Sequence, residues 1–162
     1  MTSSNIRKEY IASRVSAATP MELTRMLYEG AIQAVQEAVA AHRRGDILGR
    51  GNAVTQAVEI LGELRFALRR EVNPQYCDTL AGLYGYLQRR LIQAHAEKSE
   101  SMLQEVQGLV QTLLEGWVGA MDNLSRKQNA EPETAVQSAP GVSVSNSYSG
   151  EPGEPQNRSW EF

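Results

Sequence analysis

The segment around Thr19 constrains the fold most, because it specifies where a helix begins. The Thr19 hydroxyl is suited to accept a hydrogen bond from an unpaired backbone N–H of a first helical turn, and Glu22 completes a capping box three residues later. Pro20 occupies the first helical position, where a missing N–H costs nothing. The pattern predicts a helix from about residue 20 to residue 44.

This first helix carries apolar side chains on two faces, with the spacing that one helix face requires. One stripe consists of Leu23, Leu27, Ala31, Ala34 and Ala38, and the other of Tyr28, Ile32, Val35 and Val39. Two stripes require two apolar neighbours. One neighbour is the protein's own core, and the pattern leaves open whether the other is a further part of the bundle or a partner.

The rest of the sequence up to residue 124 predicts three more helices, at about 47–70, 75–97 and 99–124. Gly45 and Asp46 supply a helix end followed by a helix cap, Asn73 and Pro74 break the next pattern, and Ser99 caps the last helix. We find no segment of useful length with the period of a strand. The predicted fold class is therefore all-α, an antiparallel four-helix bundle joined by short turns.

Two flanking segments differ from this bundle, which we assign to residues 19–127. Residues 1–18 form a partly ordered N-terminal segment with scattered apolar residues: Ile6, Tyr10, Ile11 and Val15. Residues 128–162 hold four of the six prolines, and five glutamates against one arginine. Such a composition predicts a disordered tail, because it offers too little apolar surface to form a core.

Composition excludes several classes of protein. Charges in the body of the chain nearly balance, whereas a nucleic-acid-binding protein needs a concentrated basic face. The single cysteine cannot form an internal disulfide, which favours a reducing compartment. A polar N-terminus and the absence of any run of eighteen apolar residues argue against a signal peptide and a membrane span. We expect a soluble, cytoplasmic protein.

The sequence also lacks the usual residues of catalysis and metal binding. A di-iron bundle needs Glu three residues before His, and neither His42 nor His95 has it, so we interpret both as surface residues near helix ends. Cys77 is interpreted as a small apolar residue. We find no phosphate-binding loop and no nucleophile elbow, and predict no enzyme, no cofactor and no metal site. Arg89 and Arg90 form either a solvated face or a contact with an acidic partner.

Four helices leave outer grooves with nothing to cover them, especially on the second and fourth helices. Three candidates could cover such a groove: the N-terminal segment, which would then block it at rest, a second copy of the chain, or an amphipathic helix from a partner. From the helical faces we predict the groove contacts to be Val58, Leu61, Leu83, Leu87, Val110, Leu114 and Trp117.

Several short motifs occur in a fixed order along the chain: the Thr-Pro-x-Glu-Leu start at residues 19–23, Met-Leu-Tyr-Glu-Gly-Ala at 26–31, Gly-Asp at 45–46, Leu-Tyr-Gly-Tyr at 83–86, Arg-Arg-Leu at 89–91 and the tryptophan at 117. In order and spacing they resemble the motifs of the FliS family of flagellar secretion chaperones. The resemblance covers about residues 6–124. It departs from the family pattern at Gly85, where an acidic residue is usual.

The resemblance implies a helical bundle without enzymatic activity that binds the disordered C-terminal segment of flagellin in the cytoplasm. Such a chaperone prevents premature polymerisation and presents its cargo to a component of the flagellar export gate. In the family the N-terminal segment packs on the bundle and is rearranged by cargo, and residues matching Ile6 and Tyr10 are implicated in the handover. The alternative is a helical homodimerisation or structural adaptor module without flagellin cargo, and an enzyme comes third.

Overall fold

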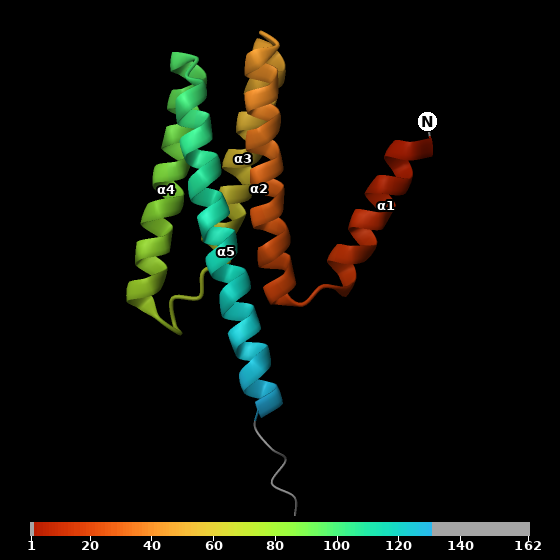
Figure 1. Cartoon of the computed structure of the whole chain (residues 1–162), viewed down its shortest axis with the longest axis vertical. Coiled ribbons are helices and arrows are strands. Elements are labelled where there is room, and N and C mark those ends of the chain that lie inside the picture. The colour runs from red at the N-terminus through yellow and green to blue at the C-terminus, as the bar shows by residue number, and fades with distance from the viewer. Residues whose placement is uncertain (1, 131–162) are drawn as a thin grey trace, which may run out of the picture. The chain divides into compact units, whose positions relative to one another are not determined.

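The computed structural model describes residues 2–130, with side chains from residue 5 onward, and contains five helices and no strand in that range. They are α1 (Thr2–Ala17), α2 (Pro20–Arg43), α3 (Ile47–Phe66), α4 (Pro74–Glu97) and α5 (Glu100–Ala130). In the bundle, α2 packs against α3 and α5, and α4 packs against the same two helices (Figure 1). The predicted all-α bundle is confirmed for α2–α5, and α1 adds a fifth helix.

The cap predicted at Thr19 is present. The backbone N–H of Glu22 donates to Thr19 Oγ1 at 3.3 Å, and the backbone N–H of Thr19 donates to Glu22 Oε2 at 3.0 Å. Pro20 follows as the first residue of α2. Local sequence alone therefore sets the start of α2, since every group involved lies within four residues.

The turns between the helices also follow from local residues. Gly45 has a φ of 71°, a left-handed conformation that glycine adopts without a steric penalty. Asp46 then caps α3, because its Oδ1 accepts from the Gly49 N–H at 2.8 Å. Asn73 caps α4 in the same way, accepting from the Tyr76 N–H at 3.1 Å.

Two helix ends differ from the prediction. Helix α3 ends at Phe66 rather than near residue 70, and the Arg69 carbonyl beyond it accepts from the Cys77 thiol at 3.2 Å. Helix α5 continues to Ala130 rather than ending near residue 124, because residues 121–130 contain neither glycine nor proline. The rest of the predicted disordered tail, from residue 131 onward, lies outside the described residues.

Both stripes of α2 are filled by the bundle itself. The two faces contribute seven buried residues: Tyr28, Ala31, Ile32, Ala34, Val35, Ala38 and Val39. They belong to one core cluster that also includes side chains of α3, α4 and α5. The second apolar neighbour of α2 is therefore another helix of the same chain and not a partner.

Candidate apolar site at one end of the bundle

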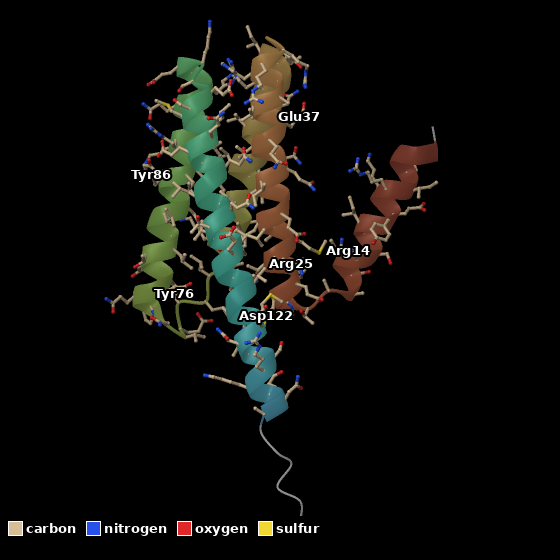
Figure 2. The ribbon with its side chains drawn as sticks, viewed as in Figure 1. Arg14, Arg25, Glu37, Tyr76, Tyr86 and Asp122 are labelled. Carbon is tan, nitrogen blue, oxygen red and sulfur yellow. The ribbon has the colours of Figure 1, made fainter. Side chains whose placement is uncertain are left out.

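An apolar pocket of about 400 Å³ lies at the end of the bundle where α2 begins. The first turns of α2 and α4, the end of α3 and the turn after it, and one residue of α5 form it. Its lining consists of Pro20, Met21, Thr24, Tyr28, Leu64, Ala67, Leu68, Arg69, Val72, Asn73, Tyr76, Cys77, Leu80, Tyr84 and Trp117. Figure 2 shows Tyr76 at this end of α4, with Tyr86 farther along the same helix.

Two buried tyrosines line the inner part of this pocket. The hydroxyls of Tyr28 and Tyr84 lie 2.5 Å apart and hydrogen-bond to each other, and their ring centroids are 6.4 Å apart. Burial raises the pKa of both phenols, so both remain protonated at neutral pH. Because each hydroxyl has a partner within the chain, this part of the pocket presents carbon surface to a ligand.

Trp117 joins α5 to the first turn of α2 at the same place. Its indole Nε1 donates to the Met21 carbonyl at 3.1 Å, and its ring packs against the core cluster. Cys77 is buried among the lining residues, which fits its interpretation as a small apolar side chain.

The rim of the pocket leaves large apolar side chains exposed. Val72 is 78% exposed and Tyr76 is 58% exposed, and both also line the pocket. Phe66, 89% exposed, lines a second hollow along α3 and α4 that shares Leu68 with the apolar pocket. Arg65 and Arg70 also line this hollow, so the surface beyond the pocket combines exposed apolar side chains with positive charge.

The other end of the bundle contains a buried polar cluster, and Ile47 and Leu48 at the start of α3 are exposed there. Arg50 of α3 is only 5% exposed, and its guanidinium meets two histidines: Nη1 lies 3.0 Å from His42 Nδ1, and Nε donates to His95 Nδ1 at 3.2 Å. Nη2 donates to the His95 carbonyl at 3.4 Å. We call these three residues the Arg50 cluster. Both histidines lie in the last turn of their helices, as expected, but each is half-buried against Arg50 and not fully exposed.

Two ion pairs connect α5 to its neighbours near this polar end. Arg43 of α2 pairs with Glu100 at 2.6 Å, and Arg90 of α4 pairs with Glu105 at 2.6 Å. The hydrogen bond from Arg43 lowers the pKa of Glu100, and hydrogen bonds from the Tyr86 hydroxyl and then from Arg90 lower the pKa of Glu105. Arg90 is thus engaged within its own chain.

The structure separates the predicted groove residues into two groups. Val58, Leu83, Leu114 and Trp117 are partly exposed and pack against the core. Leu61, Leu87 and Val110 have no exposed surface at all. Their prediction as groove contacts is corrected here, because helical periodicity identifies an apolar face but not which part of that face meets solvent.

Only Trp117 among the predicted groove residues lines the apolar pocket. The sequence analysis missed Met21, Leu68, Val72, Tyr76 and Leu80. A signal for them was available: in an antiparallel bundle the start of α2, the end of α3 and the start of α4 lie at one end. Trp117 of α5 is the one side chain of the fourth helix that lines the pocket formed by these turns.

The N-terminal residues Ile6 and Tyr10 are exposed on α1, as are Ile11 and Val15. None of them lines the apolar pocket. No described helix is long and apolar enough to cross a membrane. Within residues 2–130, no group of three or more His, Cys, Asp or Glu side chains is placed to hold a metal ion.

Comparison with known proteins decides the family. The family model described as "Flagellar protein FliS" matches residues 2–124, which include all four helices of the bundle up to Leu124. The chain belongs to the FliS family. This membership supports a chaperone role in flagellar export.

Similar chains from other bacteria agree with this family. The flagellar secretion chaperone FliS of Salmonella typhimurium is 32% identical over 108 residues, covering 66% of this chain and 80% of that protein. FliS of Bacillus subtilis is 33% identical over 114 residues, covering 70% and 84%. The flagellar secretion chaperone FliSB of Pseudomonas aeruginosa is 33% identical over 109 residues, covering 67% and 86%. All three are named as chaperones, and none of the names indicates catalysis.

Proposed function

We propose that this FliS-family chain binds the disordered C-terminal segment of a flagellin in the cytoplasm, prevents its premature polymerisation and delivers it to a component of the export gate. The apolar pocket is the single observation that carries this proposal. Its lining is carbon-rich, its inner hydroxyls are already paired, and its rim exposes Val72 and Tyr76. Such a surface suits the apolar face of an amphipathic helix.

The binding mechanism follows from the chemistry of a disordered ligand. A disordered segment loses conformational entropy when it folds onto a surface, so it needs apolar burial to compensate. The apolar pocket and the neighbouring hollow along α3 and α4 offer such burial over adjacent parts of the bundle. We propose that Val58, Leu83, Leu114 and Trp117 extend this contact, since each is partly exposed beside the core.

A matched pair of substitutions on α4 tests the proposed site. Tyr76→Asp places a charge on the pocket rim, whereas Ile92→Asp places one on the same helix at a similarly exposed position, 56%, outside the lining. With a peptide of the flagellin C-terminal segment, we expect calorimetry to show at least about tenfold weaker binding for Tyr76→Asp, equivalent to roughly 1.4 kcal/mol. Ile92→Asp should bind as the unchanged protein does. Equal affinities of the two variants would place the contact elsewhere.

Fluorescence provides an independent reading of the same event. The chain has two tryptophans, so Trp160→Phe leaves Trp117 as the sole reporter inside the pocket. Burial by a flagellin helix should shift its emission to shorter wavelength. Leu114→Asp, checked for helicity by circular dichroism, would then show whether the contact extends along α5. An unchanged affinity with an intact fold would remove Leu114 from the site.

We assign Ile6 and Tyr10 of α1 to the proposed handover. Because Ile6 and Tyr10 are exposed and lie outside the pocket lining, we expect Ile6→Ala with Tyr10→Ala to leave flagellin affinity unchanged. Capture of the complex by the export-gate component should fall. Ile11→Ala with Val15→Ala is the matched control on the same helix. Tighter flagellin binding after removal of residues 1–18 would instead favour a self-blocking segment.

Sedimentation separates this proposal from the homodimerisation alternative. A monomer that gains a one-to-one complex with flagellin supports the chaperone. A stable dimer at micromolar concentration that ignores flagellin would overturn it.

A further inference from the structure

Three arginines surround the apolar pocket and the second hollow beside it. Arg69 lines the pocket, Arg65 and Arg70 line the hollow, and the two cavities share Leu68. We call these three arginines the arginine rim. Among the described residues, no carboxylate lines either cavity. The apolar surface at this end of the bundle is therefore bordered by charge of one sign.

The charges of the arginine rim are only partly used within the chain. Arg70 pairs with Asp78 at 3.4 Å, but the two side chains are 65% and 63% exposed, and such a pair contributes little to stability. Arg65 and Arg69 form no salt bridge with any residue that the structure describes. The dipole of α3 accounts for Arg65 in its last turn but not for Arg69, which lies beyond the helix end at Phe66.

Exposed apolar side chains lie beside these arginines. Phe66, 89% exposed, lines the same hollow as Arg65 and Arg70, and Val72, 78% exposed, lines the pocket together with Arg69. The hollow has a volume of about 390 Å³, and its lining includes two small residues, Gly62 and Ala81. One bound segment can therefore contact carbon surface and positive charge at the same time.

Charge distinguishes the candidates that could cover this surface. Helix α1 has three basic side chains and one acidic side chain, a net charge of +2: Arg7, Lys8, Arg14 and Glu9. Covering the surface with α1 would therefore place positive charge against the arginine rim. A second copy packed through the same surface would set one rim against the other, because a two-fold interface uses the same patch on both copies. An amphipathic segment with carboxylates beside its apolar face complements both features.

We propose that the arginine rim selects a cargo segment that carries aspartate or glutamate beside its apolar face. The apolar side chains of the segment enter the pocket and lie against Phe66, and its carboxylates pair with Arg65 and Arg69. Guanidinium groups suit this role because they bind a carboxylate through two parallel N–H groups. The same charges repel a segment with lysine or arginine at those positions, so they supply specificity. This inference rests on the proposed flagellin binding and adds the chemistry of recognition.

Calorimetry with two peptides tests the assignment. One peptide is the flagellin C-terminal segment, and in the other every aspartate and glutamate of that segment is replaced by asparagine or glutamine. With the unchanged protein at about 50 mM salt, we expect the neutral peptide to bind about tenfold more weakly. At about 500 mM salt the difference should shrink to about twofold, because salt screens exposed charges.

A matched pair of double variants assigns the effect to the arginine rim. Arg65→Gln/Arg69→Gln removes two rim charges, whereas Arg44→Gln/Arg89→Gln removes two exposed charges that line neither cavity. The rim variant should bind the two peptides with nearly equal affinity, and the control variant should keep the tenfold difference. If circular dichroism shows that the rim variant does not fold, Arg69→Gln alone, which changes no helical residue, should remove about half of the difference on a logarithmic scale.

The possible failures are distinguishable. If the unchanged protein binds the neutral peptide as tightly as the flagellin peptide, recognition by charge is wrong and the proposed flagellin binding stands. If the unchanged protein does not bind the flagellin peptide at all, the proposed function fails, and this inference fails with it. An equal loss of discrimination in the control variant would place the recognition outside the rim. A dimer that dissociates only in the rim variant, or a gain in affinity for both peptides once residues 1–18 are removed, would assign the surface to a second copy or to α1.

Discussion

The two ends of the bundle solve the problem of buried polar groups in opposite ways. At the pocket end, Tyr28 and Tyr84 satisfy each other's hydroxyls and leave apolar surface open to solvent. At the polar end, Arg50 brings a full charge into the interior and uses side chains from two other helices to hold it. The pocket end is therefore suited to contact with another molecule, and the Arg50 end to holding three helices in register.

The largest expected effect comes from Arg50→Lys, which keeps the charge and removes the planar fork. A lysine ammonium cannot reach both rings as the guanidinium does. Because hydrogen bonds from a charged donor contribute about 1.5 kcal/mol each, the loss of two should lower the free energy of unfolding by about 3 kcal/mol. Urea unfolding near pH 8 measures this. Arg89→Lys, at an exposed position, is the control. An equal loss of unfolding free energy in this control would show that the contacts of Arg50 do not explain the effect.

At the pocket end, Tyr84→Phe leaves the Tyr28 hydroxyl buried without a partner. We expect a loss of about 2 kcal/mol, within the range for an unsatisfied buried group. The double variant Tyr28→Phe/Tyr84→Phe removes both hydroxyls and should recover most of that loss. Thermal unfolding of the two single variants and the double variant completes a double-mutant cycle. A double variant no better than the singles would mean that packing of the rings, and not the hydroxyl pair, stabilises this end.

A smaller effect is expected for Trp117→Phe, which removes the hydrogen bond to the Met21 carbonyl. Water can reach this half-buried carbonyl, so the loss should be about 1 kcal/mol. Its effect on flagellin-peptide affinity should exceed its effect on stability, since Trp117 lines the pocket. Calorimetry and urea unfolding of the same samples measure both losses. A loss of stability larger than the loss of affinity would mean that Trp117 has only a structural role.

The smallest expected effect is a change in the acid dependence of stability, which comes from two glutamates of α5 near the Arg50 end. The pKa of Glu100 and of Glu105 is lowered in the folded chain, so their contribution is complete above the ordinary value of 4.5 and declines as pH falls below it. Glu105→Gln should therefore flatten the fall of the urea midpoint between about pH 5 and pH 3. An equal slope in the variant and the unchanged protein would show that other carboxylates control the acid response.

Sequence alone predicted the helices well because their starts depend on neighbouring residues. The Thr19–Glu22 cap and the Asn73 cap each act within three positions, and a short-range pattern captures them. The end of α3 was harder to place, because the apolar pattern continues through Leu68 although the helix ends at Phe66.

The two ends themselves were only partly predictable. Trp117 was predicted as a groove contact from the apolar face of its helix, but its partner Met21 lies on another helix. Arg50 looked like an ordinary helical arginine, and nothing in its neighbourhood along the chain indicated that it would meet both His42 and His95. Such contacts depend on how helices align, which periodicity does not encode.

The bond between Trp117 and Met21 joins residues 96 positions apart and completes the pocket with the last helix. A chain still emerging from the ribosome has Met21 and Tyr76 available long before Trp117 exists. A partly translated molecule therefore lacks one wall of the pocket, which is complete only once synthesis has passed the middle of α5.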